Sequence, residues 1–213
     1  GRGGTDGINA SYGGEISGLG TAPKGSVNDA RTYYGGVIRS NFTHIDSPTS
    51  APPAPEETVR TWNSIDGDSW RSYGNWLNYG DVRQGDWTGN GLHRGFWFFG
   101  DGPSKELVGK TINKMRLYVT RRSAGGYSAS RTATFRYHNY TSKTNAGSGT
   151  PAVSSTTASA NFAWGEGKWV TLPTSFHAPF EAGTAKGIAI YTTSTRDNYM
   201  IFSKNAKLEV TYS

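Results

Sequence analysis

Cysteine is absent from the sequence, which excludes disulfide scaffolds, thiolate zinc sites and cysteine nucleophiles. Long apolar runs are absent as well. No stretch approaches the roughly 20 residues that cross a bilayer, so the sequence predicts no membrane insertion. No signal peptide opens the chain, and its first residue is Gly1 rather than Met, which is typical of a processed or partial polypeptide.

Metal-binding motifs are also lacking. The histidines are far apart and none stands in an HxH or HExxH spacing, which predicts no histidine metal site; they are His44, His93, His138 and His177. Asp66 and Asp68 alternate around a glycine as in a calcium loop, but the twelve-residue ligand series of an EF-hand is missing. A solvated surface turn is the favoured interpretation of these two acids, with calcium as the alternative.

Signatures of catalysis are absent too, since the sequence has no GxSxG elbow, P-loop or kinase motif. Paired carboxylates could cleave glycosides, and five acids are available for this: Asp81, Asp86, Asp101, Glu166 and Glu181. Acids beside glycines more often form turns. The sequence therefore predicts a protein that is not an enzyme and has no cofactor.

The net charge is +6 and the pI is about 9.5, which would suit an anionic partner such as nucleic acid or a cell-wall polymer. However, the basic residues are scattered, Arg121-Arg122 is the only adjacent pair, and no nucleic-acid motif is present. Solubility is the favoured explanation of the charge, and no nucleic-acid partner is expected.

Glycine and aromatic residues are plentiful, at 29 residues and 13%, and this mixture favours short strands joined by tight turns. In Ile112–Arg121, Met115, Leu117 and Val119 alternate with polar residues, as in a strand with one buried face. The same period marks 131–138 and 207–212, and shorter strand signals lie at 94–99, 168–172, 187–193 and 199–202. We therefore predict an all-β, antiparallel, jelly-roll-like β-sandwich.

Two segments depart from this pattern. Residues 1–57 are irregular and rich in Gly and Pro, and we interpret them as an extended attachment or oligomerisation segment and linker ahead of a β-sandwich binding domain at 58–213. Within them, the apolar residues of Ala30–Phe42 could dock onto a partner chain. Thr141–Asn161 is a long polar stretch, interpreted as a surface excursion with a short edge strand around Ala152–Ser155.

Aromatic residues are concentrated between Trp62 and Phe99, interleaved with Asp, Asn, Arg and Gly. Aromatic faces beside hydrogen-bonding groups suit sugar rings, so the candidate glycan-binding residues are Trp70, Tyr73, Trp76, Tyr79 and Trp87. Packing in the core is the competing interpretation of these rings, and it is favoured for Trp97, Phe135 and Trp169. If a glycan binds, the stretch Trp70–Trp87 should contribute more than the scattered charge.

Several ordered patterns resemble one family. They are GDWTGNGLHRGFWFF (85–99), TINKMRLYVTRR (111–122), GEGKWVTLPTSFHAPFEAGTAKGIAIY (165–191) and AKLEVTY (206–212). From about Arg60 onwards the chain resembles the C-terminal domain of minor tail proteins from phages of actinobacteria. It is also similar to jelly-roll domains appended to bacterial secreted proteins.

The tail-protein resemblance implies a place in the virion, at the tail tip or fibre, often as a homotrimer. The expected partners are other copies of the chain, other tail proteins and a host cell-surface glycan or wall polymer. The alternative is a carbohydrate-binding module of a secreted protein, which would be monomeric. A third hypothesis, a glycan-cleaving tailspike, requires two carboxylates in one groove.

We predict that segment 1–57 owes its order to neighbouring subunits, because it has too few apolar residues to build a core of its own. Limited proteolysis of species separated by size-exclusion chromatography with light scattering would test this. The segment should be protected in an oligomer and cleaved in a monomer. Equal protection in a demonstrated monomer would contradict the prediction.

Overall fold

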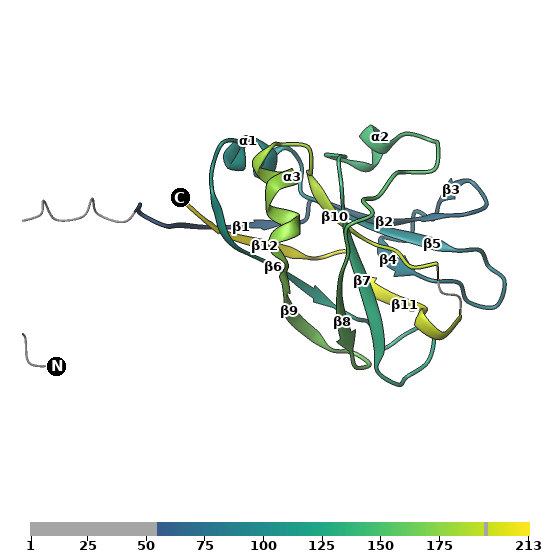
Figure 1. The fold of residues 1–213 in the computed structure, drawn as a ribbon. Helices are drawn as coiled ribbons and strands as arrows, with labels where there is room; N and C mark the ends of the chain where they lie inside the picture. Colours follow the sequence, from purple (N-terminus) through teal and green to yellow (C-terminus); the bar gives the residue numbers. More distant parts are fainter. Residues whose placement is uncertain (1–54, 194–195) are drawn as a thin grey trace, which may run out of the picture. The chain divides into compact units, whose positions relative to one another are not determined.

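Antiparallel β-strands dominate the computed structural model, which describes residues 55–193 and 196–213 (Figure 1). The predicted segment at 1–57 lies outside the described residues apart from its last three, so the predicted contacts of 30–42 do as well. The α-helices in the described part are short: α1 (Gly102–Leu107), α2 (Lys143–Ala146) and α3 (His177–Glu181). Single 3-10 turns lie at η1 (Thr174–Phe176) and η2 (Arg196–Asn198). The prediction of an all-β protein is confirmed.

Two sheets face each other. One has four strands in the order β1 (Thr58–Asn63), β12 (Lys207–Tyr212), β6 (Ile112–Thr120) and β9 (Gly167–Leu172). The other has six, in the order β3 (Asn75–Trp76), β2 (Asp66–Arg71), β5 (His93–Phe98), β10 (Gly187–Ile190), β7 (Arg131–His138) and β8 (Ala158–Phe162). A separate ribbon pairs β4 (Asp81–Gln84) with β11 (Met200–Ser203).

The strand order is that of a jelly roll with additions. When β2, β3, β4 and β11 are set aside, the other strands, renumbered along the chain, lie in the orders 1-8-3-6 and 2-7-4-5. Neighbouring strands in both sheets are antiparallel. This is the double-sheet arrangement that strand alternation predicted. Figure 1 shows α1 and α3 at one end of the sandwich, with β4 and β11 at the other.

The core lies between the sheets and follows the predicted alternation. Met115, Leu117 and Val119 of β6 are fully buried, and so are Trp97 and Phe135 on the opposite sheet. Each such side chain contributes about 1.5–3 kcal/mol through the apolar area it removes from water. The core assignment of Trp97 and Phe135 is therefore confirmed.

The core assignment of Trp169 is wrong. In β9, Val170 and Leu172 point into the sandwich, so Trp169 lies on the outer face of the four-stranded sheet and is only partly buried. Its ring packs edge-on against Tyr118, with centroids 5.4 Å apart, and the Arg116 guanidinium lies 4.4 Å from its centroid. The period-two rule itself excludes Trp169 from the core once Val170 is placed there.

A second apolar cluster lies on the outer face of the six-stranded sheet. It consists of Trp70, Phe96, Phe98 and Ala189, with Trp76, Tyr140 and Val153 packed against it. The excursion at 141–157 is tied to this face, because the Trp76 indole N–H donates to the Gly147 carbonyl at 3.0 Å and Arg94 donates to the Pro151 carbonyl at 2.9 Å. The excursion thus shields rings that would otherwise meet water.

The edge strand of this region is β8, so the predicted strand at Ala152–Ser155 is wrong. Ser154 is attached to β7 by other means: its Oγ accepts a hydrogen bond from the Tyr137 amide, and its carbonyl accepts one from Arg136 at 2.6 Å. One backbone bond also joins them, from the Ser154 amide to the Tyr137 carbonyl at 2.9 Å, but regular ladder pairing begins only at Ala158.

The surface-turn interpretation fails for Asp68, and its surroundings do not suit calcium. Asp68 lies in β2 and is 1% exposed. Its oxygens accept hydrogen bonds from the amides of Ser69 and Asn78, and Lys143 donates to it at 3.0 Å. This buried carboxylate is therefore paired, and it anchors α2 to the sheet.

His138 is buried on the same outer face, between Phe96, Phe98 and Tyr140. Nε2–H donates to the Trp97 carbonyl at 3.1 Å, and Nδ1 accepts from the Tyr140 amide at 3.2 Å, which fixes a neutral tautomer. Burial lowers the pKa of His138 to about 4. A Cβ at residue 187 would lie 2.4 Å from this ring, so only Gly187 fits beneath it.

We predict that acid weakens the fold through His138. Because the unfolded state binds a proton at about pH 6.5 and the folded state only near pH 4, stability is lost as pH falls through this window, by about 3 kcal/mol in total. Urea unfolding between pH 7 and 4 should show a shallower loss in His138→Gln than in wild type. Equal slopes in both proteins would contradict this.

Candidate functional site

The candidate site lies where β4 crosses the six-stranded sheet. A Cβ at residue 95 would come within 2.4 Å of the Val82 side chain and 2.8 Å of the Arg83 backbone, so Gly95 of β5 permits the contact. The buried Ser69 hydroxyl fixes β4 in place, because it donates to the Asp81 carbonyl at 2.9 Å and accepts from the Arg83 amide at 2.8 Å. The crossing is thereby held by hydrogen bonds as well as by close packing.

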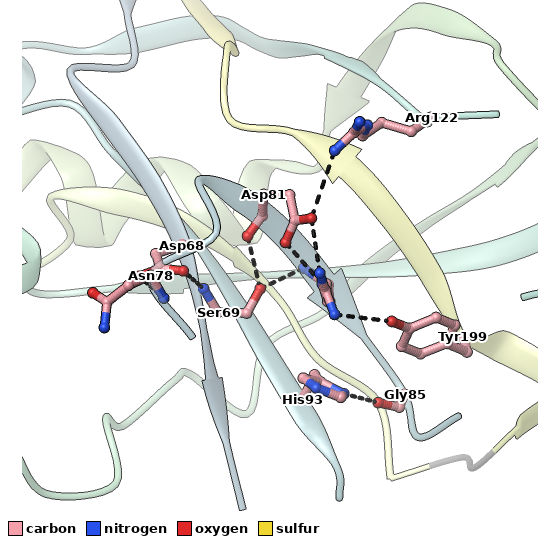
Figure 2. A network of polar contacts seen from close by, with 9 residues as sticks. Asp68, Ser69, Asn78, Asp81, Gly85, His93, Arg122 and Tyr199 are labelled. Atoms are coloured by element: carbon pink, nitrogen blue, oxygen red, sulfur yellow. Dashed lines mark hydrogen bonds and ion pairs between the residues drawn. The ribbon is translucent and has the colours of Figure 1, made fainter. Parts of the chain in front are cut away.

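Asp81 is the electrostatic centre of this region. It is 4% exposed, and both its carboxylate oxygens accept hydrogen bonds from Arg83, at 2.8 and 2.9 Å. Arg122 lies 3.6 Å from the same carboxylate, and Figure 2 shows Asp81 between the Arg122 side chain and the neighbouring guanidinium. Burial lowers the pKa of Arg83, but Asp81 and Tyr199 more than offset this, so the guanidinium stays charged.

Arg83 connects two groups of aromatic rings. On one side its guanidinium lies 5.1 Å from the centroid of Tyr79, which is 67% exposed. On the other side it donates to the Tyr199 hydroxyl at 3.4 Å (Figure 2). Burial raises the pKa of Tyr199, so the hydroxyl stays protonated at neutral pH.

The contacts continue from Tyr199 through further rings. Trp87 stacks on Tyr199 with centroids 5.8 Å apart, and Tyr127 meets Trp87 edge-on at 5.3 Å. The guanidinium of Arg131 then lies 5.0 Å from the centroid of Tyr127. We call this set the aromatic–arginine ladder; it consists of Tyr79, Arg83, Tyr199, Trp87, Tyr127 and Arg131.

Trp87 is held by a tight loop that follows β4. The Trp87 carbonyl accepts hydrogen bonds from the amide and the side chain of Asn90, at 3.2 and 2.9 Å. At the base of the loop, the Gly85 carbonyl accepts from the His93 amide at 3.0 Å and from its Nδ1–H at 2.9 Å (Figure 2). Burial lowers the pKa of His93, which therefore acts as a neutral clamp.

Tyr127 is positioned by a buried arginine. Arg121 is completely buried and donates to the backbone carbonyls of Tyr127, Ala129 and Phe162. Three carbonyls satisfy much of its donor capacity, although its Nε has no hydrogen-bond partner among the described residues. Arg121 thus fixes the segment that presents Tyr127 to the ladder.

The structure separates the predicted glycan-binding residues. Tyr79 and Trp87 both join the ladder, whereas Tyr73 is exposed and lies against the loop that carries Trp87, with its hydroxyl donating to the Gly89 carbonyl. Trp76 is partly buried against Phe96 of the outer cluster. Trp70 is 2% exposed, so the prediction that its ring stacks on a ligand is corrected: it is buried in the outer cluster, where Trp76 packs edge-on against it.

The available acids do not form one group. Asp101 pairs with Lys105 on α1, Glu181 accepts from the Ile112 amide, and Glu166 accepts from the Ala163 amide. Asp81 and Asp86 remain near Tyr199. In the described part of the chain, no three His, Asp or Glu side chains gather as a metal ion would require. No helix in the described ranges is long and apolar enough to cross a membrane.

Sequence reasoning missed Arg83, Tyr127, Arg131 and Tyr199. Arg83 and Tyr199 are 116 positions apart in sequence, so no local pattern connects them. One signal was available: Tyr127 follows Gly125 and Gly126, both with positive φ, in a segment too glycine-rich to form a strand. A ring in such a segment is more often displayed than buried.

Comparison with known proteins gives few matches. No protein-family model matches the sequence, and neither does any curated protein. One solved structure that matches is the decameric BFDV capsid protein, at 10% identity and a TM-score of 0.29, over 74% of this chain and 98% of that one. A TM-score this low does not show a shared fold, so the match says nothing about the role of this chain.

We predict that Ser69→Ala destabilises the protein by about 2–4 kcal/mol, because it leaves a buried amide on Arg83 and a buried carbonyl on Asp81 without their partner. Ser104→Ala is the matched control, since that hydroxyl makes one exposed bond on α1 and should cost less than about 1 kcal/mol. Urea denaturation measures both. Similar losses in the two variants would contradict the role given to Ser69.

Proposed function

We propose that this chain is a receptor-binding protein of a bacteriophage tail, whose β-sandwich binds a glycan of the host cell envelope through the aromatic–arginine ladder. The ladder is the observation that supports a glycan site. Its ends are accessible, with Tyr79 67% and Tyr127 37% exposed, while its middle is fixed by packing and hydrogen bonds.

The chemistry of the ladder suits a saccharide. Sugar rings stack on aromatic faces through their C–H groups, and their hydroxyls bind neighbouring polar groups. Here the rings alternate with guanidinium groups, which offer several N–H donors in one plane. Because Arg83 is held by Asp81 and Trp87 by its loop, little side-chain entropy is lost on binding.

The place in a phage tail rests on the sequence resemblance, and we propose with it a homotrimer whose N-terminal segment mediates attachment. A rigid sandwich that displays a loop-borne site at one end suits this role. The alternative, a carbohydrate-binding module of a secreted protein, would use the same ladder. Light scattering separates the two, because the tail protein should be a trimer and the module a monomer.

We propose binding rather than catalysis at this site. The carboxylates that act on the pKa of Tyr199 in the ladder are Asp81 and Asp86, and Asp197 lies two positions before Tyr199 in η2. Both oxygens of Asp81 are bonded to Arg83, so this carboxylate is neutralised where a glycosidase would need an acid or a nucleophile. The hydrogen bonds of Asp81 instead position Arg83 between Tyr79 and Tyr199.

We predict that Trp87→Ala and Tyr79→Ala each weaken binding to cell walls of actinobacterial hosts by about fivefold to tenfold, the loss of roughly one stacking contact. Trp169→Ala is the matched control, since it removes a partly exposed tryptophan from the opposite sheet. Cosedimentation with purified walls at low and high sodium chloride provides the measurement, and thermal denaturation confirms folding. Part of the wild-type binding should persist at high salt, because stacking is not screened.

Trp76→Ala is a poor test of the site, because this ring supports the outer cluster and its indole N–H binds the Gly147 carbonyl. The ladder would be the wrong site if Trp169→Ala reduced wall binding while Trp87→Ala and Tyr79→Ala left it unchanged. Loss of all binding in salt, with both ladder variants at wild-type affinity, would favour the basic surface alone.

A further inference from the structure

We infer that the glycan bound at the ladder is acidic, and that Arg131 pairs with its carboxylate or phosphate group while the sugar ring stacks on Tyr127. This rests on the proposed function and names the chemical class of the ligand. The geometry points to Arg131 because its guanidinium lies over the Tyr127 ring at an accessible end of the ladder.

Positive charge exceeds negative charge around the ladder. Four arginines lie at or beside it, namely Arg83, Arg121, Arg122 and Arg131. Three acids lie near these rings, namely Asp81, Asp86 and Asp197 of η2, and Asp81 is shared between Arg83 and Arg122. His93 adds no charge at neutral pH, because burial lowers its pKa. The region therefore has a surplus of cations that an anionic ligand could neutralise.

Arg131 is the least satisfied of these cations. Among the described residues, its guanidinium makes no ion pair and its buried Nε has no hydrogen-bond acceptor. Its one contact of note is with the face of Tyr127, which leaves the planar N–H groups without a carboxylate. A partly buried guanidinium without an anion is costly unless a ligand completes it.

Arg121 adds positive charge close to Arg131 and provides no anion that could pair with it. Burial lowers the pKa of Arg121, and the positive charge of Arg131 lowers it further, so the two guanidinium groups repel each other. Arg121 is fully enclosed, and its hydrogen bonds go to backbone carbonyls rather than to an acid. An incoming anion can reach Arg131 but not Arg121, and it would relieve the repulsion between them.

Arg122 offers a second, weaker contact for the same ligand class. Its side chain is 53% exposed, and it lies 3.6 Å from an Asp81 oxygen that already accepts a hydrogen bond from Arg83. Much of its charge thus faces solvent. Arg131 differs, because it combines an unpaired charge with an adjoining aromatic face, and that combination fits an acidic sugar better than a free anion.

Carboxylates of uronic acids and phosphodiesters of wall polymers share the chemistry that a guanidinium recognises. The experiment therefore uses three defined probes in calorimetric titrations of the full chain: polygalacturonate, its fully methyl-esterified neutral form, and a glycerol-phosphate polymer. The first two have the same sugar rings and differ in charge. Wild type is compared with Arg131→Gln and Trp87→Ala. The charge control is Lys110→Gln, which changes an exposed lysine just after α1, at the far end of the sandwich from β4 and β11 (Figure 1).

We expect an acidic probe to bind at least about tenfold more tightly than the neutral polymer. Loss of a hydrogen bond to a charged group typically lowers affinity by this factor or more. Arg131→Gln should abolish that preference and leave weak binding of the neutral polymer intact, while Lys110→Gln should match wild type. Polygalacturonate binding identifies a carboxylate, and binding of the glycerol-phosphate polymer alone identifies a phosphodiester.

Three results would overturn the inference. One is equal affinity of the wild type for the esterified and acidic polymers, with Trp87→Ala weakening the binding of both. The proposed glycan site would then stand, but it would have no specificity for acidic sugars. Another is a preference for the acidic polymers that Arg131→Gln and Lys110→Gln reduce equally. This would mean that the acidic polymers bind through the overall positive charge of the protein and not at Arg131. The third is binding of no probe, which would remove the acidic ligand class, or binding that Trp87→Ala does not alter, which would also remove the proposed site.

Discussion

The close crossing of β4 over β2 and β5 is the constraint on which the candidate site depends. Gly95 allows the backbone of Arg83 to approach β5, and the Ser69 hydroxyl bonds to β4 in both directions. Because β4 is fixed at this point, Asp81 and Arg83 face β11 and reach Tyr199 from a distant part of the chain. The same ribbon contributes Val82, Met200 and Phe202 to the core, so core packing as well as hydrogen bonding holds the ladder in place.

Different buried charged groups order the two ends of the ladder. Around Asp81, a buried carboxylate orders Arg83, and the cost of burying the charge is offset by two short hydrogen bonds. Around Tyr127, the buried Arg121 orders the backbone through carbonyls alone, and Arg131 remains without an acid among the described residues. At the first end Arg83 has a carboxylate partner, whereas at the second end Arg131 has none in the described part of the chain and leaves a positive charge that an anionic ligand could pair with.

The fold was largely predictable from the sequence, whereas the site was predictable only in part. Period-two alternation identified β6, β7 and β12, because one face of each strand is buried. The same local pattern could not show which outward-facing rings another segment would cover. Trp70 is buried in the outer cluster, against which Val153 of the excursion packs, and Trp169 is partly exposed because nothing described covers its sheet face. Of the five predicted residues, Tyr79 and Trp87 lie in the ladder, and their partners come from positions that only the tertiary fold brings close.

The most direct test of the glycan site is nuclear magnetic resonance of the tryptophan side chains. The chain has 7 tryptophans, and each indole N–H gives a separate signal in a ¹H–¹⁵N spectrum. During titration with the tightest-binding acidic polymer, or a short oligomer of it, the Trp87 signal should shift most, while those of Trp97 and Trp169 should stay in place. A spectrum in which Trp169 shifts and Trp87 does not would move the binding site to the outer face of the four-stranded sheet and contradict this account.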